Sequence, residues 1–137
     1  MKKNKKTLVA VFLIAIMCMT SVTAFASDER PSSRLSHSDS GSFSFSATAN
    51  GGYVDVTYYG YDSFVRADLT VEIQKRFLLV IWNDVAVWNV SSTEIDGHFY
   101  NTIPLDGSGT YRAKFTLLIT GNDGTVDTIT DVIQNSY

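Results

Sequence analysis

A regular alternation of apolar and polar residues constrains this chain more than any other feature of its sequence. Across residues 110–120, every second residue is apolar, and polar residues occupy most positions between them. A repeat of two places successive side chains on opposite faces of a β-strand, so one face can be buried while the other meets water. No apolar stripe with helical spacing occurs beyond Ala26. The sequence therefore predicts sheets and not helices. The residues expected to face inward are Tyr111, Ala113, Phe115, Leu117 and Ile119.

Similar segments recur along the chain and are separated by residues typical of turns, such as Asn50-Gly51-Gly52 and residues 121–124. Short strands with turns about every 8–12 residues are typical of a β-sandwich or a small barrel. We therefore predict an all-β domain over residues 42–137, folded as a two-layer antiparallel β-sandwich of about seven to eight strands. The pattern of residues 125–133 is imperfect, which predicts either a β-bulge or an edge strand.

One apolar run breaks the alternation. Residues 77–82, from Phe77 to Trp82, are all apolar, and Asn83-Asp84 after them predicts a turn. Periodicity alone cannot distinguish a buried strand from a short helix here, but the β-branched and aromatic content favours a strand. An exposed strand of this composition would aggregate. We therefore expect the run to be buried, or to form the interface of a homo-oligomer or of a hetero-complex.

The N-terminal residues have the three parts of a secretory signal peptide. Four lysines lie among the first six residues, an apolar run of 12 covers residues 8–19, and Ala24-Phe25-Ala26 has the form of a cleavage site. The apolar run is too short to span a bilayer, which needs about 20 residues. The prediction is a signal peptide over residues 1–26 and then a serine-rich disordered spacer over residues 27–41.

Removal of residues 1–26 would change the charge of the chain. Beyond Ala26 there are 7 Lys+Arg and 14 Asp+Glu, a net charge of −7, and the only cysteine, Cys18, lies in the predicted signal. This balance argues against nucleic acid and anionic membranes as partners. Because Cys18 would be removed with the signal, the remaining chain would have no disulfide, no Cys-based metal site and no Cys nucleophile. We expect a secreted protein, extracellular or associated with the cell surface, with no membrane span after signal removal.

Residues 109–113, Gly-Thr-Tyr-Arg-Ala, resemble the start of strand F in immunoglobulin-like and fibronectin-type domains. The resemblance implies a tyrosine corner, in which the ring of Tyr111 is buried and its hydroxyl donates a hydrogen bond to a backbone carbonyl at the entrance to the strand, with Gly109 in the turn before it. Ala113 stands where an immunoglobulin domain has cysteine. The resemblance thus implies an immunoglobulin-like sandwich without the disulfide.

The general layout is similar to that of small exported proteins of Gram-positive bacteria that belong to families of unknown function. The similarity is carried by the lysine-led signal, the serine-rich spacer, Ile73-Gln74-Lys75, the spaced residues Trp82, Val85 and Trp88, and residues 109–114. It covers roughly residues 42–133. Because no activity is attached to such families, the resemblance implies none.

The residues offer little for catalysis or metal binding. Beyond Ala26, His37 and His98 have no third histidine or cysteine to complete a zinc set, and both are predicted to be surface residues. The loop at Asp123 lacks the ligand spacing of an EF-hand. A nucleophile motif of the form Gly-x-Ser-x-Gly is absent, and no pair of carboxylates is marked as sharing a cleft. We expect no cofactor and no enzymatic activity.

Aromatic side chains provide the better candidates for function. Tyr59, Tyr61, Trp82 and Trp88 would make a platform for stacking sugar rings, or an anchor for a protein, if they were exposed. The alternative is that aromatic residues fill the core of a sandwich without disulfides. The hypothesis is a secreted, non-catalytic interaction module with an unknown protein or glycan partner. A carbohydrate-binding module that uses exposed aromatics is the alternative.

Overall fold

The computed structural model describes residues 35–137. The predicted signal peptide and the first part of the predicted spacer lie outside these residues. The described part of the chain forms seven strands and contains no helix. The strands are β1 (Ser38–Thr48), β2 (Gly51–Gly60), β3 (Phe64–Phe77), β4 (Ile81–Ser92), β5 (Asp96–Ile103), β6 (Thr110–Gly121) and β7 (Val126–Ser136).

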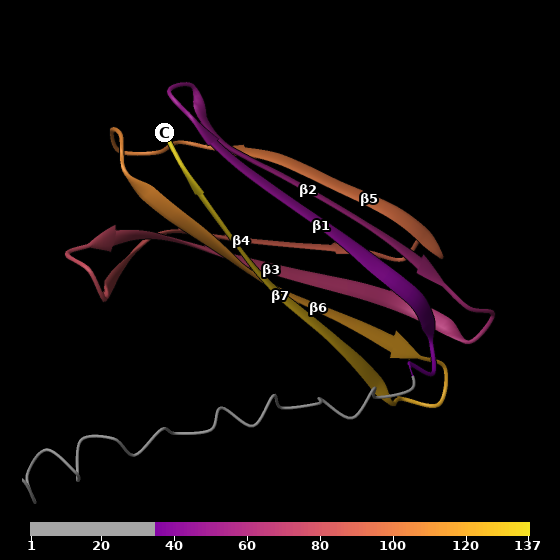
Figure 1. The fold of residues 1–137 in the computed structure, drawn as a ribbon. Helices are drawn as coiled ribbons and strands as arrows, with labels where there is room; N and C mark the ends of the chain where they lie inside the picture. Colours follow the sequence, from indigo (N-terminus) through magenta and orange to yellow (C-terminus); the bar gives the residue numbers. More distant parts are fainter. Residues whose placement is uncertain (1–34) are drawn as a thin grey trace, which may run out of the picture. The chain divides into compact units, whose positions relative to one another are not determined.

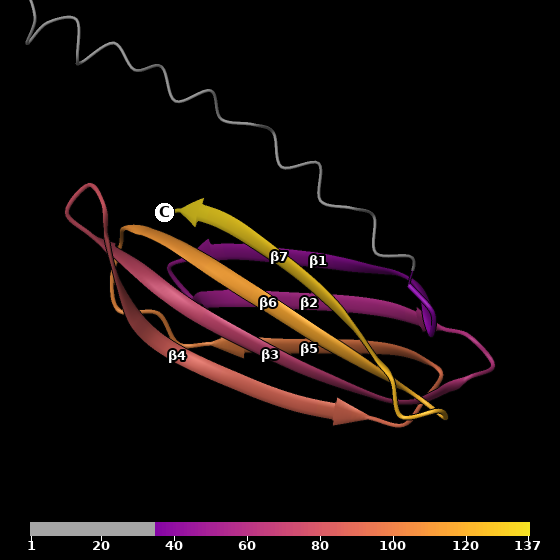
Figure 2. The same cartoon turned by 90° about the horizontal axis from the view of Figure 1, so that it is seen from below.

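The seven strands form two antiparallel sheets that pack face to face (Figures 1 and 2). One sheet has the order β1-β2-β5 and the other the order β4-β3-β6-β7. Neighbouring strands in both sheets are antiparallel. The predicted all-β, two-layer antiparallel sandwich is thereby confirmed, with seven strands.

The core lies between the two inner faces and is built by the alternation seen in the sequence. All five residues predicted to face inward from β6 are at most 1% exposed. β7 is an edge strand, which explains its irregular pattern: Ile129 and Ile133 pack against the core, while Val126 and Val132 stay exposed. The buried hydrophobic residues are Phe45, Ala47, Val54, Val56, Tyr58, Ala67, Leu69, Val71, Ile73, Phe99, Ile103, Tyr111, Ala113, Phe115, Leu117 and Ile119.

The first strand begins earlier than the sequence suggested. β1 starts at Ser38, inside the predicted spacer, and the preceding His37 is only 4% exposed. The prediction that His37 is a surface residue is therefore wrong. The physical reason is that its ring nitrogens find partners in Ser63 and Thr125, and its backbone amide donates to Asp127. These contacts hold a polar segment that has little apolar surface of its own to bury.

The apolar run at residues 77–82 forms a hairpin and not one buried strand, so that prediction is wrong. Phe77 ends β3, Ile81 begins β4, and the two residues are paired across a turn at residues 78–80. The predicted turn at Asn83-Asp84 is also wrong, because both residues lie within β4. The chain reverses at Leu78, which takes a left-handed backbone conformation with φ of 59°.

The loop before β6 is closed by Tyr111. The tyrosine ring is fully buried, and its hydroxyl lies 2.7 Å from the backbone carbonyl oxygens of Asp106 and Gly107. Gly109 turns the chain into β6 with φ of 151°, and a Cβ at this position would lie 2.9 Å from Lys75 Cε. This arrangement has the hydrogen bonding of a tyrosine corner.

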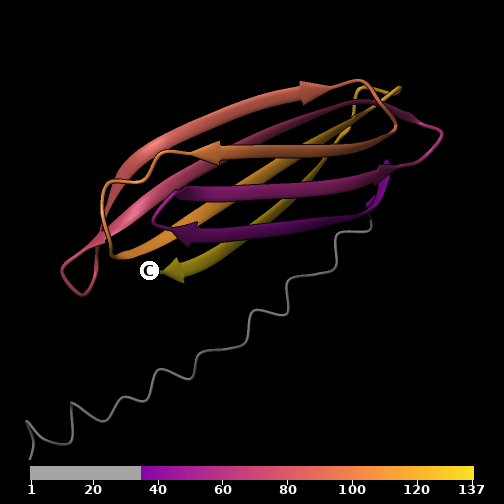
Figure 3. The ribbon, with the colours of Figure 1, turned by 90° about the horizontal axis from the view of Figure 1, so that it is seen from above.

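The connections gather at two opposite ends of the sandwich (Figure 3). The tip end carries the β1–β2, β3–β4 and β5–β6 connections. The base end carries residues 35–37 and the β2–β3, β4–β5 and β6–β7 connections, which are joined by backbone hydrogen bonds such as Gly60 N to Ile95 O and Asn122 N to Ser63 O. The two ends differ in chemistry, and this difference positions the candidate site.

Candidate functional site

The most exposed apolar surface of the described chain is the turn between β3 and β4. We call residues 77–81 the hairpin tip. Exposure is 56% for Phe77, 68% for Leu78, 87% for Leu79, 82% for Val80 and 46% for Ile81. The hairpin projects beyond the neighbouring connections at the tip end (Figures 1 and 3). A contiguous apolar patch of this kind on a folded domain marks a site of interaction with a protein or a membrane.

The tip is exposed because the β3–β4 hairpin continues past the end of the core. Ile73 is the last core residue of β3, and the pairing of β3 with β4 shifts in register between Ile73 and Gln74. Such an irregularity bends and twists a hairpin locally. Beyond it, none of residues 77–81 packs against the core. The sandwich therefore does not use the tip for its own stability.

A set of cationic and aromatic side chains surrounds the base of the tip. We call Lys75, Arg76, Trp82 and Arg112 the collar. The Arg112 guanidinium lies 4.2 Å from the centre of the Trp82 ring, and its Nε donates a hydrogen bond of 2.7 Å to Gln74 Oε1. A cation over the face of an indole is attracted by the quadrupole of the ring. The Trp82 side chain is thereby held beside the tip.

Hydrogen bonds also hold Lys75 and Arg76, the two collar residues of β3, in position. Arg76 Nη2 donates a 3.1 Å hydrogen bond to Thr110 Oγ1, and the Lys75 ammonium donates to the backbone carbonyl of Asp106. The Lys75 Nζ also lies 5.3 Å from the centre of the Tyr111 ring. No carboxylate of the described residues forms an ion pair with Lys75, Arg76 or Arg112. None of these three positive charges is therefore neutralised by an ion pair within residues 35–137, and Arg76 is exposed to solvent.

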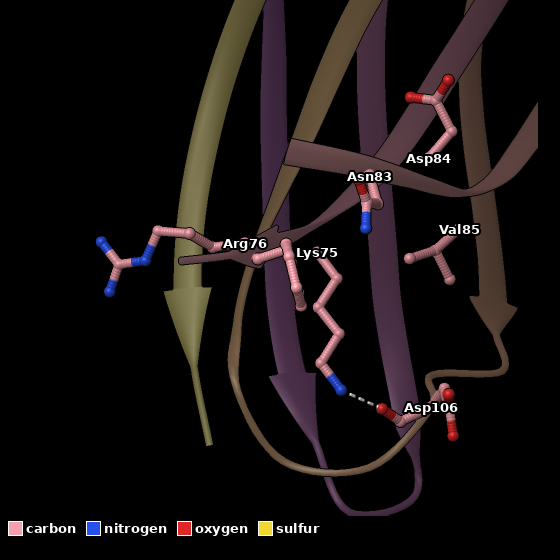
Figure 4. A pocket seen from close by; sticks show the side chains of 7 residues that line it. Lys75, Arg76, Asn83, Asp84, Val85 and Asp106 are labelled. Atoms are coloured by element: carbon pink, nitrogen blue, oxygen red, sulfur yellow. Dashed lines mark hydrogen bonds between the residues drawn. The ribbon is translucent and has the colours of Figure 1, made fainter. Parts of the chain in front are cut away.

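A shallow pocket of about 460 Å³ lies beside the collar. Figure 4 shows Lys75 reaching across it to the Asp106 backbone, while Arg76 points away. The Asp84 carboxylate is engaged by Gln74 Nε2 at 2.6 Å. The mixed charges suit a polar group better than an apolar ligand, and no nucleophile–base pair lines the pocket. It is lined by Lys75, Arg76, Phe77, Asn83, Asp84, Val85 and Asp106.

The base end contains a serine, a histidine and an aspartate close together. His37 Nδ1 lies 2.8 Å from Ser63 Oγ, and His37 Nε2 lies 2.5 Å from Thr125 Oγ1 and 3.5 Å from Asp123 Oδ1. Hydrogen bonds from the backbone and side chain of Thr125 hold the pKa of Asp123 below its usual range. Both histidine nitrogens thus have protein partners and the ring is buried, so the group fastens the start of β1 to the β6–β7 turn.

The four aromatic residues predicted from the sequence do not form one platform. Tyr59 and Tyr61 are exposed at the base end, and the Tyr61 hydroxyl donates to Asp39. Trp82 lies at the opposite end, in the collar. Trp88 is half-buried and packs against the core. Of the four, only Trp82 lies beside the hairpin tip.

The remaining groups considered for chemistry are dispersed. His98 is exposed and its Nε2 lies 3.0 Å from Asp55 Oδ2, as an ordinary surface pair. No group of three or more His, Cys, Asp or Glu residues that could hold a metal ion occurs within residues 35–137. Among the same residues, no helix has the length and apolar character needed to cross a membrane.

Comparisons with known proteins give no further guidance, since no protein-family model, curated protein or solved structure matches this chain. The resemblance to exported Gram-positive proteins stays a prediction. The sequence had already singled out residues 77–82 as a possible interface, but not the turn that exposes them. The collar residues Arg76 and Arg112 were not predicted, because nothing in the sequence indicates that they lie beside the same turn.

Proposed function

We propose that this chain is a secreted, non-catalytic β-sandwich that acts as an interaction module outside the cell or at its surface. The hairpin tip is its contact surface. One observation carries the proposal: five consecutive apolar residues, 77–81, are each 46–87% exposed, and none of them packs against the core. Leaving this much apolar surface in water is unfavourable unless a partner covers it.

The fold supports the proposal because the core between the two sheets stabilises the domain, while the hairpin tip lies outside this core. The two sheets, of order β1-β2-β5 and β4-β3-β6-β7, and the hydrogen bonding of a tyrosine corner at the start of β6 are compatible with an immunoglobulin-like sandwich. Sandwiches of this class carry many unrelated functions, so the class itself assigns none. Binding residues of such scaffolds lie on connections at the ends, and the hairpin tip is a connection of this kind.

A glycan-binding role through a single aromatic platform has less support. Sugar rings stack on aromatic rings that lie close together and are free on one face. Tyr59 and Tyr61 lie at the base end, whereas Trp82 lies at the tip end with Arg112 over its ring. Tyr59 and Tyr61 alone remain as a small candidate surface for carbohydrate. Loss of glycan binding on changing these two tyrosines would favour that alternative.

Site-specific photo-crosslinking in the producing cells tests the proposed function. A photoreactive amino acid replaces Leu79 at the tip, and a matched control replaces Thr93, which is exposed in the β4–β5 connection at the base end. We expect adducts with an envelope component at position 79 and not at position 93. The same experiment reports export, because the processed chain should begin at Ser27. Absence of adducts at position 79 in exported protein would contradict the proposal.

A further inference from the structure

We propose that the hairpin tip inserts into the surface of a lipid bilayer that carries anionic headgroups, and that the collar binds those headgroups. This inference rests on the proposed function and names the partner of the same site. Four features favour lipid over a groove on a protein as the partner. They are the apolar side chains on both faces of the tip, the backbone conformation of Leu78, the residue types of the collar, and the distribution of charge along the sandwich.

The apolar side chains surround the tip on both faces of the hairpin. Successive residues of a strand point to opposite faces. Phe77 and Ile81 are paired across the hairpin, and Leu78, Leu79 and Val80 close it, so neither face is polar. A flat protein surface would cover one face of such a ribbon and leave the other in water. A bilayer surrounds both faces at once, because lipid is an apolar medium with no required direction of contact.

The backbone at Leu78 supports a role for its side chain outside the fold. A φ of 59° places Leu78 in the left-handed region, which glycine or asparagine occupies more readily than a bulky residue. Strained residues of this kind persist where the surroundings or the function require them. The Leu78 side chain is 68% exposed, so packing within the sandwich does not require it. An apolar side chain at the turn is explained if it enters the bilayer.

The collar has the composition found at the level of lipid headgroups. Tryptophan is enriched at membrane–water interfaces, and arginine and lysine side chains reach toward anionic headgroups while their stems lie on apolar surface. Trp82 adjoins the tip in sequence, and the Arg112 guanidinium covers its ring. Arg76 is exposed and Lys75 is half-buried next to the tip. With the tip buried, these four side chains lie where the headgroups begin.

Positive and negative side chains are unevenly distributed along the sandwich, so the net charge of the chain does not describe the charge at the hairpin tip. The tip end carries Lys75, Arg76 and Arg112 against the carboxylates of Asp84 and Asp106. The base end carries six carboxylates, and among residues 35–137 the lysine or arginine near them, Arg66, is paired with Asp68 at 2.7 Å. An anionic surface therefore repels the base end and accepts the tip end. The six base-end carboxylates belong to Asp39, Asp62, Glu94, Asp96, Asp123 and Asp127.

Distance prevents the base end from opposing this orientation. β3 has 14 residues and runs from the base end to the tip. At a rise of roughly 3.3 Å per residue, it is about 45 Å long. Screening in physiological salt falls off over about 8 Å, so the base-end carboxylates are several screening lengths from a surface that the tip contacts. The charge of the whole chain therefore does not exclude an anionic membrane, although the sequence alone argued against one.

Vesicle binding by the chain from Ser27 onward tests the inference. Removing residues 1–26 leaves the described sandwich complete, because all of the core residues lie between Phe45 and Ile119. This chain has no cysteine. An environment-sensitive fluorophore is therefore attached to one introduced cysteine, either Val80→Cys in the tip or Thr93→Cys at the base end. The vesicles contain phosphatidylglycerol and phosphatidylcholine in equal parts, or phosphatidylcholine alone.

We expect the probe at position 80 to shift to the blue and brighten with the anionic vesicles, while the probe at position 93 does not change. In the Val80→Cys chain, Leu79→Asp should weaken binding by roughly tenfold or more, because an apolar side chain is lost from the inserted surface. Arg76→Gln should weaken it by roughly fivefold, the effect of one positive charge near an anionic surface. Val132→Asp is the matched control, since Val132 is 56% exposed on β7, outside the tip and the collar.

A further variant separates membrane binding from folding. Leu78→Gly removes one apolar side chain but relieves the left-handed backbone, so the melting temperature should not fall while vesicle binding weakens. Equal binding to both vesicle types, an unchanged probe at position 80, or full binding by Leu79→Asp would overturn the inference. Dimerisation that depends on Leu79, without vesicle binding, would assign the tip to a second copy instead. A protein adduct at position 79 without vesicle binding would overturn the lipid inference and leave the proposed function intact.

Discussion

Replacing Tyr111 with phenylalanine tests how the loop before β6 is closed. The change removes a hydroxyl whose oxygen lies 2.7 Å from the carbonyl oxygens of both Asp106 and Gly107. The Tyr111 ring is fully buried, and a phenylalanine ring fills the same space. No cavity forms, so the change in the free energy of unfolding reports the hydrogen bond itself.

The magnitude depends on what remains bonded to the two carbonyl groups. Losing one hydrogen bond lowers stability by about 0.5–1.5 kcal/mol, and leaving a buried acceptor without any donor costs about 1–3 kcal/mol. Here the Asp106 carbonyl keeps the Lys75 ammonium as a donor, and the Gly107 carbonyl keeps the Tyr137 hydroxyl. We therefore expect about 1 kcal/mol for Tyr111→Phe, which lowers the melting temperature by roughly 4–8 °C in a domain of this size.

A double-mutant cycle sharpens this prediction. Tyr137→Phe removes the second donor to Gly107, and the two rings stack with their centres 5.9 Å apart. In the double variant the Gly107 carbonyl has neither hydroxyl, so the combined loss should exceed the sum of the single losses. Urea unfolding followed by tryptophan fluorescence measures each value, with Tyr100→Phe as a control for an exposed hydroxyl. Strictly additive losses, or no loss for Tyr111→Phe, would refute the reasoning.

Four further changes test other parts of the sandwich. Gly97→Ala would place a Cβ 2.2 Å from the ring of Tyr58, its partner across β2 and β5, and should destabilise the fold by about 1–3 kcal/mol in urea; a smaller residue at position 58 should reduce this loss. His37→Ala should speed hydrogen exchange at the amides of Ser36 and Tyr61, measured by NMR, because the start of β1 loses its attachment to Ser63 and Thr125. Burial raises the pKa of Tyr58 above its usual value near 10, so the native chain holds this proton more tightly than the unfolded chain. Stability should therefore fall as the pH rises above about 10, and the melting temperature of Tyr58→Phe should depend less on pH in that range. Phe115→Ala should lower the free energy of unfolding by about 3–5 kcal/mol in the same urea assay.

The sequence predicted the framework well because alternation directly encodes burial on one face of a sheet. β6 shows this most clearly, since each residue predicted to face inward is buried. β2 behaves in the same way, with Val54, Val56 and Tyr58 fully buried on one face. The sequence also predicted glycine-containing turns such as the one at residues 121–124, because glycine and asparagine adopt the backbone conformations that chain reversals need.

The candidate site was less predictable, because its turn lacks the residues that usually mark turns. The turn consists of Leu78, Leu79 and Val80, and none of these is a residue type that is common in tight turns. The sequence therefore predicted a strand here and placed the turn at Asn83-Asp84. Only tertiary structure decides that the core ends at Ile73 and that the hairpin continues beyond it. The collar depends on long-range pairing as well, since Arg112 meets Trp82 only across the β4-β3-β6 sheet.

The β3–β4 hairpin has a consequence for how chains of this kind can diverge. No fully buried residue lies on it between Ile73 and the end of β4. Mutations at the turn therefore escape the selection that keeps the interior intact, and the tip can be rewritten without a new scaffold. Descendants of one ancestral sandwich could thus acquire different targets by exchanging a few residues, while the rest of the molecule stays recognisably the same.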